Sequence, residues 1–421
     1  MPRFRPPLSA GLRVAFLCYR GNPHSGGQGV YTRHLTRELV ALGHEVAVFA
    51  GQPWPELDPS VAFVPVPSLD LYRRPFPLWW PWPSQLKTRI DWLEWGLAST
   101  GQFPEAHTFS YRAARELRGR TGEFDVIHDN QCLGRGLRQV LADGWPVLAT
   151  IHHPITVDFE LELEHANGAW RRYCLRRWYS FLPAQIEVAR LMPRVVTVSQ
   201  SSRRDIVDQM GVDAQRISVV PVGVDHTRFR PLPGRRRVPG RLLTTASADV
   251  PLKGLVPLLE ALAKVRTERP DVHLVVIGRH RAGSTLPSVL ERLDLREAVS
   301  FVSGVSDERI VELYAEAQLA VVPSLYEGFS LPAVEAMACG TPLVATTGGA
   351  LPEVVGAAGD TARLVPPNDP QALAGAIAEL LDDPAGRECL AEGGRRRVLE
   401  RFTWRATAEA TVAEYRKVIG C

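Results

Sequence analysis

Short apolar runs alternate with longer segments of helical periodicity along most of the chain. In the first half the apolar runs cover residues 12–18, 45–50, 124–128, 147–151 and 194–198. In the second half they cover residues 242–246, 272–277, 299–302, 319–322 and 342–345. Buried strands separated by helices are typical of parallel sheets that are covered on both faces. The pattern therefore predicts an α/β protein with two doubly wound, Rossmann-like parallel sheets.

A stretch rich in proline, glycine and arginine, at residues 221–240, separates the two halves. Its apolar residues follow neither the helical nor the strand periodicity. A length of 421 residues also fits two domains. We therefore expect a first domain at 1–221, with a tryptophan-rich insertion at 51–103, and a second domain at 222–403. Residues 404–421 have helical periodicity with no strand after them, so we expect this helix to pack back on the first domain.

Composition narrows the possible functions. Lys plus Arg number 49 and Asp plus Glu 46, so the net charge of +3 is too small for a dedicated nucleic-acid binder. The six cysteines are scattered without a CxxC pair, which indicates neither a zinc site nor a disulfide framework. The sequence contains no run of about 18 apolar residues, the length that a membrane-spanning helix needs, and no apolar signal segment follows the N-terminus. We expect a cytoplasmic protein.

Ligands of open α/β sheets bind where the strands end and helices begin. The first such loop, NPHSGGQGVY, contains Gly26 and Gly27, where backbone amides could approach a phosphate. A structural turn is an equal alternative. The GGxG spacing differs from the GxGxxG of dinucleotide folds, and no acidic residue closes the second strand at Ala50, which argues against a nicotinamide cofactor.

Two loops of the second half carry charged candidates. Lys253, in DVPLKGL, is suited to a diphosphate, although most lysines are merely solvated. The loop PSLYEGFSLPAVEAMACG places Glu327 before a helix and Glu335 within it. Amides at the start of that helix would face an anion, and the two carboxylates could accept hydrogen bonds from sugar hydroxyls. The alternative is that the acids only stabilise the helix dipole.

The segment EGFSLPAVEAMACGTPLVA, with seven residues between Glu327 and Glu335, resembles the signature of retaining GT-B glycosyltransferases of family four. The resemblance continues through the motifs GGxGVY, LxxLGHEVxV, VTVSQSSRRDI, PVGVD, LKGL, FVSGVSDERIVELYAEA and the closing FTW helix, in family order. It covers nearly the whole chain. It implies the GT-B fold, in which two Rossmann-like domains face each other across a cleft.

The resemblance also implies roles for single residues. The implied donor-binding set is Gly26, Gly27, Ser247, Lys253, Glu327, Gly328, Phe329, Ser330, Leu331 and Glu335. Lys253 would be the cation on the diphosphate, Glu327 the ligand of the donor sugar, and Glu335 the ligand of the ribose. The implied catalytic residues are His152, Glu327 and Lys253. His152 would contact the donor sugar near the anomeric carbon; a capping or core histidine is the alternative.

Three positions depart from the family pattern. Ser247 stands where an arginine is common, so we look to Arg20, Arg279 or Arg281 for the missing positive charge. His153 stands where aspartate is more common, and Val222 where asparagine is.

The implied reaction transfers a hexosyl group from a UDP- or GDP-sugar to an acceptor hydroxyl on a glycolipid, a polysaccharide or a natural product, with retention of configuration. No DxD follows a strand, so we expect no tightly bound metal and no other cofactor. Two alternatives remain open: a nucleotide-sugar epimerase of the same fold, and a degenerate sugar-nucleotide-binding module. A dehydrogenase is disfavoured because the ribose-binding acid is missing.

Acceptor choice is expected in the first domain, including the segment HDNQCLG at residues 128–134. The tryptophan-rich insertion is either a packed excursion or an aromatic platform for a sugar or lipid. Arginines recur at helical spacing near Trp170 and Trp178, namely Arg171, Arg172, Arg176 and Arg177. This face could make peripheral contact with anionic lipid at the inner face of the membrane, could be solvated, or could belong to an acidic-acceptor pocket.

Overall fold

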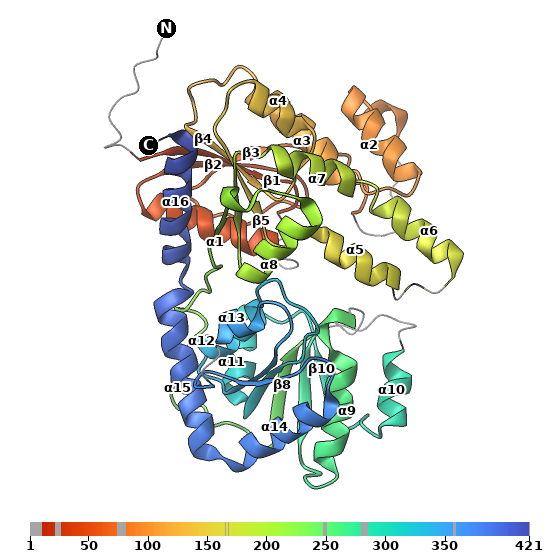
Figure 1. Cartoon of the computed structure of the whole chain (residues 1–421), viewed down its shortest axis with the longest axis vertical. Helices are drawn as coiled ribbons and strands as arrows, with labels where there is room; N and C mark the ends of the chain where they lie inside the picture. Colours follow the sequence, from red (N-terminus) through yellow and green to blue (C-terminus); the bar gives the residue numbers. More distant parts are fainter. Residues whose placement is uncertain are drawn as a thin grey trace. The chain divides into compact units, whose positions relative to one another are not determined.

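The computed structural model describes residues 11–21, 27–73, 81–164, 166, 168–246, 251–278, 285–356 and 359–420. These residues divide into two compact units, each built around one sheet (Figure 1). The first unit takes its described residues from Met1–Val198, Ser202–Val220 and Thr407–Cys421. The second unit takes its described residues from Ser199–Ser201 and Pro221–Ala406.

Each sheet is entirely parallel. The first has the strand order β3-β2-β1-β4-β5-β6-β7. Its strands are β1 (Arg13–Cys18), β2 (Glu45–Ala50), β3 (Ala62–Pro65), β4 (Val126–Asn130), β5 (Val147–Ile151), β6 (Arg194–Thr197) and β7 (Ile217–Val219). The second has the order β10-β9-β8-β11-β12-β13. Its strands are β8 (Arg241–Thr245), β9 (His273–Ile277), β10 (Val299–Val302), β11 (Leu319–Val322), β12 (Leu343–Thr346) and β13 (Arg363–Val365).

Helices connect the strands. Before residue 221 they are α1 (Gly27–Ala41), α2 (Arg89–Ser99), α3 (Glu105–Leu117), α4 (Gly136–Ala142), α5 (Ile155–Glu164), α6 (Ala169–Trp178), α7 (Leu182–Leu191) and α8 (Gln200–Asp205), which continues as the π-helix η2 (Ile206–Met210). After it they are α9 (Leu255–Arg266), α10 (Leu286–Arg292), α11 (Asp307–Glu316), α12 (Leu331–Ala338), α13 (Leu351–Val355), α14 (Pro370–Asp382), α15 (Pro384–Arg401) and α16 (Trp404–Ile419). Short 3₁₀ turns are η1 (Pro83–Gln85), η3 (Ala214–Arg216) and η4 (Pro251–Lys253).

Both faces of each sheet are buried, which explains the continuous apolar runs. In β9, Leu274 and Val276 belong to the core that the second sheet shares with α9 and α14. Val275 lies between them, points to the opposite face and is also buried. In the first unit, Ala15 and Leu17 of β1 lie in the core that the sheet shares with α3, α4 and α7. The opposite face of the sheet meets α16, where the Tyr415 hydroxyl lies 2.6 Å from His128 Nδ1.

Local chemistry sets several helix ends. The Ser306 hydroxyl accepts a hydrogen bond from the Arg309 amide at 3.3 Å and caps α11. The Asp369 carboxylate accepts from the amides of Gln371 and Ala372 and caps α14 in the same way. After α1 the chain turns at Gly43, whose φ of 88° favours glycine.

The structure confirms the predicted fold class, and the ten predicted strands are present with shifts of one or two residues at some ends. Three strands, β3, β7 and β13, were not predicted. The tryptophan-rich insertion contains β3, η1 and α2, and part of it, residues 74–80 with Trp79 and Trp80, lies outside the described residues.

Candidate active site

The loop between β11 and α12 holds four of the candidate residues, Glu327, Gly328, Phe329 and Ser330. Ser330, the residue before α12, has a left-handed backbone with φ 88°. Its side chain is buried, and its Oγ has no hydrogen-bond partner in the described structure. The first N–H groups of a helix have no partner within the helix, so this end of α12 presents donors and a partial positive charge. The buried hydroxyl and the helix end together form a candidate site for an anion.

Phe329 has a different role from the one its place in the motif suggests. Its side chain is buried, and its ring packs against Phe402 with the centroids 5.6 Å apart. Only its backbone is therefore available to a ligand. Gly328 precedes Phe329 in the loop, and Leu331 is the first residue of α12.

Lys253 and Glu327 form an ion pair. Lys253 Nζ lies 2.9 Å from Glu327 Oε1, and the same oxygen accepts a hydrogen bond from the Ser324 hydroxyl at 2.7 Å. The Leu325 amide donates to the Leu252 carbonyl at 2.7 Å, which joins the loop carrying the lysine to the loop carrying the glutamate. The structure therefore brings these two predicted residues together, with the carboxylate largely buried.

Gly254 makes this close approach of the two loops possible. A Cβ at this position would lie 1.9 Å from the Pro323 carbonyl oxygen, and its φ of 65° is in the left-handed region. Any larger residue would push the Lys253 loop away from the loop that carries Glu327.

Glu335 lies one turn into α12 and is half-buried. Its Oε2 accepts a hydrogen bond from the Tyr314 hydroxyl on α11 at 3.2 Å. Burial raises the pKa of Glu335 to about 7, and the Tyr314 hydrogen bond partly opposes this rise. The group is therefore poised to gain or lose a proton near neutral pH.

A glycine pair that sequence reasoning missed supports Glu327. Gly348 and Gly349 follow β12, and a Cβ on Gly349 would lie 2.3 Å from the Glu327 carbonyl oxygen. The Ala350 amide donates to that same oxygen at 2.8 Å. The signal was present in the sequence TTGG directly after an apolar strand, since paired glycines there indicate close backbone contact.

His152 follows β5 in the first unit. Its Nε2 lies 2.8 Å from Asn130 Oδ1, and its amide donates to Gln131 Oε1 at 2.8 Å. The rings of His152 and Tyr31 form a T-shaped pair with their centroids 4.7 Å apart. Burial lowers the pKa of His152 to about 3, so the imidazole is neutral at physiological pH. The neighbouring His153 is paired with Asp158 at 2.8 Å.

Several predicted residues cannot be placed. Gly26, Ser247, Arg279 and Arg281 lie outside the described residues. Gly27 is exposed at the first residue of α1, and a Cβ there would meet nothing within 4 Å, so packing does not require glycine at this position.

Arg20, the third arginine considered as a replacement for the missing cation, lies 3.1 Å from the carboxylate of the buried Glu105. Its guanidinium therefore already has a carboxyl partner within the first unit.

Two aromatic surfaces of the first unit remain candidates for acceptor contact. Trp170 and Tyr173 of α6 are 75% and 53% exposed, and their rings stack with centroids 5.5 Å apart. In the insertion, Trp82 and Trp92 are 74% and 52% exposed. A buried ion cluster of Arg112 with Asp91 and Glu94 fastens α2, which carries Trp92, to α3.

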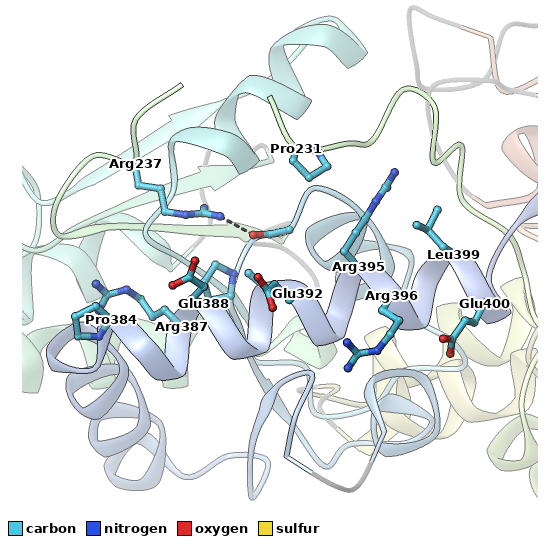
Figure 2. Close-up of a pocket in the computed structure, with 13 residues that line it drawn as sticks. Pro231, Arg237, Pro384, Arg387, Glu388, Glu392, Arg395, Arg396, Leu399 and Glu400 are labelled. Carbon is cyan, nitrogen blue, oxygen red and sulfur yellow. Dashed lines mark hydrogen bonds between the residues drawn. The ribbon is translucent and has the colours of Figure 1, made fainter. Parts of the chain in front are cut away.

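A cavity of about 890 Å³ lies along α15 in the second unit (Figure 2). Arg237 and Arg395 line it, but their guanidinium groups already donate to the Gly340 and Ala338 carbonyls. None of the predicted site residues lines this cavity. Within the described ranges, no cluster of three or more His, Cys, Asp or Glu side chains is arranged to bind a metal. Nor does any helix there have the length and apolar character needed to cross a bilayer.

Two family models match the chain. The model for glycosyl transferases group 1 matches residues 236–397, and the model for Glycosyltransferase Family 4 matches residues 25–228. An MMP alpha-(1->4)-mannosyltransferase of Mycolicibacterium hassiacum is 51% identical over 409 residues, which cover 97% of this chain and 98% of the relative. A D-inositol 3-phosphate glycosyltransferase of Kineococcus radiotolerans is 30% identical over 442 residues, covering 98% and 96%.

Solved structures agree on the fold. A sucrose-phosphate synthase from Thermosynechococcus elongatus superposes with a TM-score of 0.72 at 24% identity, covering 97% of this chain and 99% of its own. Anabaena HepE in complex with UDP-glucose gives 0.69 at 18% identity, covering 96% and 100%. Together with the relative that is half identical over its whole length, these matches show that the chain belongs to the group 1, family 4 glycosyltransferases and is a hexosyltransferase with the GT-B fold.

Proposed function

We propose that this enzyme transfers a mannosyl group from a nucleoside diphosphate mannose to the 4-hydroxyl of a sugar acceptor, forming an α linkage. The observation that carries the proposal is the 51% identity, over 97% of the chain, to an enzyme named as an alpha-(1->4)-mannosyltransferase. A donor whose sugar is α-linked to phosphate would give this product with retention of configuration. Because the chain belongs to a glycosyltransferase family, glycosyl transfer is favoured over both alternatives, the nucleotide-sugar epimerase and the degenerate sugar-nucleotide-binding module.

The N-terminus of α12 is the proposed seat of the donor diphosphate. Its free N–H groups and the unpartnered Ser330 hydroxyl would donate to phosphate oxygens. Lys253 has three N–H donors, of which one is engaged by Glu327, so two remain for the diphosphate. Anabaena HepE, which shares the fold, was crystallised with UDP and with UDP-glucose.

The two glutamates are proposed to bind hydroxyl groups on either side of the diphosphate. Glu327 uses Oε1 for Lys253 and Ser324, and Oε2 would accept from a hydroxyl of the sugar. Glu335, when ionised, would accept from the ribose hydroxyls. Because a carboxylate accepts hydrogen bonds from neighbouring hydroxyls, this pair suits a nucleotide sugar better than a simple phosphate.

The proposed reaction proceeds on one face of the sugar. The bond from the anomeric carbon to the diphosphate breaks, the acceptor oxygen bonds to the same carbon, and the acceptor proton passes to the leaving phosphate oxygen. Negative charge grows on the leaving group, where Lys253 and the α12 N-terminus would stabilise it more than in the bound donor. These positive groups would do the work of a metal ion, so we propose catalysis without a tightly bound metal. His152 is proposed to contact the sugar near the anomeric carbon as a neutral imidazole.

The test is a donor and acceptor screen with the purified chain. GDP-mannose, UDP-glucose and UDP-N-acetylglucosamine are each incubated with α-linked manno-oligosaccharides or with inositol 3-phosphate, with and without EDTA. Release of nucleoside diphosphate is measured, and the anomeric configuration of the product is read by NMR. We expect GDP release with the mannosides, unaffected by EDTA. Transfer only to inositol 3-phosphate would favour the activity of the relatives that are 30% identical, and a β-linked product would refute retention.

A pair of lysine variants tests the site itself. Lys253→Ala is expected to lower kcat/KM by about 100-fold to 1000-fold, the usual effect of losing one group that stabilises transition-state charge. Lys264→Ala, on the exposed side of α9, is the matched control and should leave the rate unchanged. Equal kcat/KM values for the two variants would show that Lys253 does not take part in the reaction.

We also propose that the exposed α6 surface makes peripheral contact with anionic membranes. Its support is the exposure of Trp170 and Tyr173 on a helix that carries Arg171 and Arg176. Cosedimentation with vesicles of phosphatidylglycerol and of phosphatidylcholine tests it, since binding to the anionic vesicles should fall in a Trp170→Ala/Tyr173→Ala variant. Absence of the wild-type protein from both pellets would refute the contact.

A further inference from the structure

The loop after β4 has an unusual backbone. Gln131 and Leu133 have φ values of 55° and 46°, which non-glycine residues rarely adopt. The buried Asp129 holds the loop in this shape, because its Oδ2 accepts from the amides of Cys132 and Leu133 at 3.1 and 3.0 Å. Backbone strain of this kind persists where the surrounding structure enforces it, and it is concentrated at functional sites.

Two consecutive side chains hold the His152 segment: Asn130 at the end of β4 and Gln131 in the loop that follows. Gln131 Oε1 accepts from the His152 amide at 2.8 Å, and Gln131 Nε2 donates to the His153 carbonyl at 2.8 Å. Asn130 Oδ1 lies 2.8 Å from His152 Nε2. Gln131 therefore bonds to the His152 amide and the His153 carbonyl, while Asn130 contacts the His152 ring.

The orientation of the Asn130 amide is fixed by its other contacts. Asn130 Nδ2 donates to Thr32 Oγ1 at 3.1 Å and approaches the Gln28 carbonyl at 3.4 Å. The Asn130 oxygen must then face His152, and an amide oxygen can only accept. His152 Nε2 therefore carries the proton, and because the ring is neutral, Nδ1 carries a lone pair. Within the described residues no hydrogen bond to Nδ1 is found.

We propose that Asn130 and Gln131 are positioning residues for glycosyl transfer, which hold His152 in its Nε2-protonated form with Nδ1 as a hydrogen-bond acceptor for a sugar hydroxyl. The inference rests on the proposed function, in which His152 contacts the donor sugar. A ring of the opposite tautomer would present a donor at Nδ1 and would fail to accept from that hydroxyl. Asn130 selects the tautomer, and Gln131 fixes the peptide from which the ring projects.

Asn130 variants test the proposal by kinetics. Asn130→Ala should lower kcat by about 10-fold to 100-fold, the range found for residues that orient a functional histidine in metal sites, while the KM for GDP-mannose changes less than about threefold. Asn130→Asp keeps an acceptor but adds a negative charge that favours the imidazolium, whose Nδ1 is a donor. It should add an ionisation between pH 5 and 8 to the kcat profile, with activity lost on the acid side.

The other charges near His152 are accounted for in this comparison. The imidazole of His153 acts on His152 electrostatically and is paired with Asp158. His128, whose own pKa is lowered to about 3 by burial, is the other nearby titratable ring, and Tyr31 packs against His152 edge-on. Asp129, whose pKa burial raises to about 6, is present in the wild type and in both variants, so its ionisation does not distinguish them. In Asn130→Asp the new carboxylate and His152 titrate as a pair, and the ¹⁵N shifts of the His152 ring followed against pH show which step belongs to the imidazole.

A matched control perturbs the same loop without touching His152. Gln185 Nε2 donates to the Cys132 carbonyl at 3.2 Å, and Gln185→Leu removes that bond. This variant should lose stability and keep wild-type kcat. If Gln185→Leu lowers kcat as much as Asn130→Ala does, the effect is general loosening of the loop, and the proposal is overturned.

A spectroscopic measurement separates this inference from the proposed function. Long-range ¹H–¹⁵N correlation spectra of the full chain with labelled histidine identify which ring nitrogen of His152 is protonated, with no donor present. We expect Nε2–H in the wild type and a mixed population in Asn130→Ala. An Nδ1–H tautomer in the wild type overturns the inference. Unchanged transfer by His152→Ala would instead refute the role of His152 in the proposed function, while the tautomer result stands.

Discussion

Protonation of Glu335 should control donor affinity near neutral pH. Burial raises the pKa of Glu335 to about 7, and the ionised carboxylate accepts hydrogen bonds from hydroxyl groups more strongly than the protonated acid does. If binding requires that form, the apparent Kd doubles at about pH 7 and rises about tenfold between pH 8 and pH 6. The assay is calorimetric titration with GDP-mannose and no acceptor, because the diphosphate of a nucleotide sugar is esterified at both ends and does not itself titrate in this range.

Glu335→Gln is the control for this pH dependence. The amide cannot ionise, so its Kd should be flat from pH 6 to pH 8. It should exceed the wild-type Kd at pH 8 by about 10-fold to 100-fold, because hydrogen bonds to a charged group contribute about 1.5–3 kcal/mol. A wild-type Kd that is constant over this range, or a variant that keeps the wild-type slope, would refute the assignment of Glu335 as a ribose ligand.

Three further predictions concern the same unit. The folded chain keeps a proton on Glu335 that the unfolded chain loses above its ordinary pKa of 4.5. The free energy of unfolding therefore falls as the pH rises from 4.5 to about 7. In urea unfolding, Glu335→Gln should raise this free energy by up to about 3 kcal/mol at pH 8 and change it little at pH 4. Tyr314→Phe removes a hydrogen bond that lowers the pKa of Glu335, and should move the midpoint of donor binding upward by about one pH unit. Gly254→Ala should lose at least about 1–2 kcal/mol in unfolding, because its backbone is left-handed and its Cβ would overlap the Pro323 carbonyl; wild-type stability would contradict that geometry.

The strands that sequence reasoning missed are all at sheet edges. β3 and β7 are the two edges of the first sheet, and β13 is one edge of the second. A central parallel strand is buried on both faces and reads as a continuous apolar run, whereas an edge strand is short and partly exposed. β3 shows this plainly, since none of the four residues of Ala62–Pro65 is buried. The apolar pattern identified the central strands of both sheets and one edge strand, β10, and missed the other three edges.

The candidate site was predictable where it depends on motifs in one stretch of chain. The spacing of Glu327 and Glu335 and the lysine at a strand-to-helix junction are local features, and the structure brings Lys253 to Glu327 at 2.9 Å. The support of His152 was not predictable in this way. It depends on the left-handed backbone of Gln131, a conformation that sequence favours for glycine and asparagine and that only tertiary packing imposes on glutamine.

The ion pair of Lys253 and Glu327 has a polarity that fits the proposed transition state. In the bound donor the phosphate is anionic and the sugar is neutral. As the bond to the anomeric carbon lengthens, the phosphate gains negative charge and the sugar gains positive charge. A lysine facing the phosphate and a carboxylate facing the sugar would stabilise both changes. Because the Ser324 hydroxyl donates to the Glu327 carboxylate and Gly349 packs against the Glu327 backbone, little reorganisation would be needed. In the proposed reaction the pair would therefore favour the separated charges of the transition state over the bound donor, which is the requirement for catalysis.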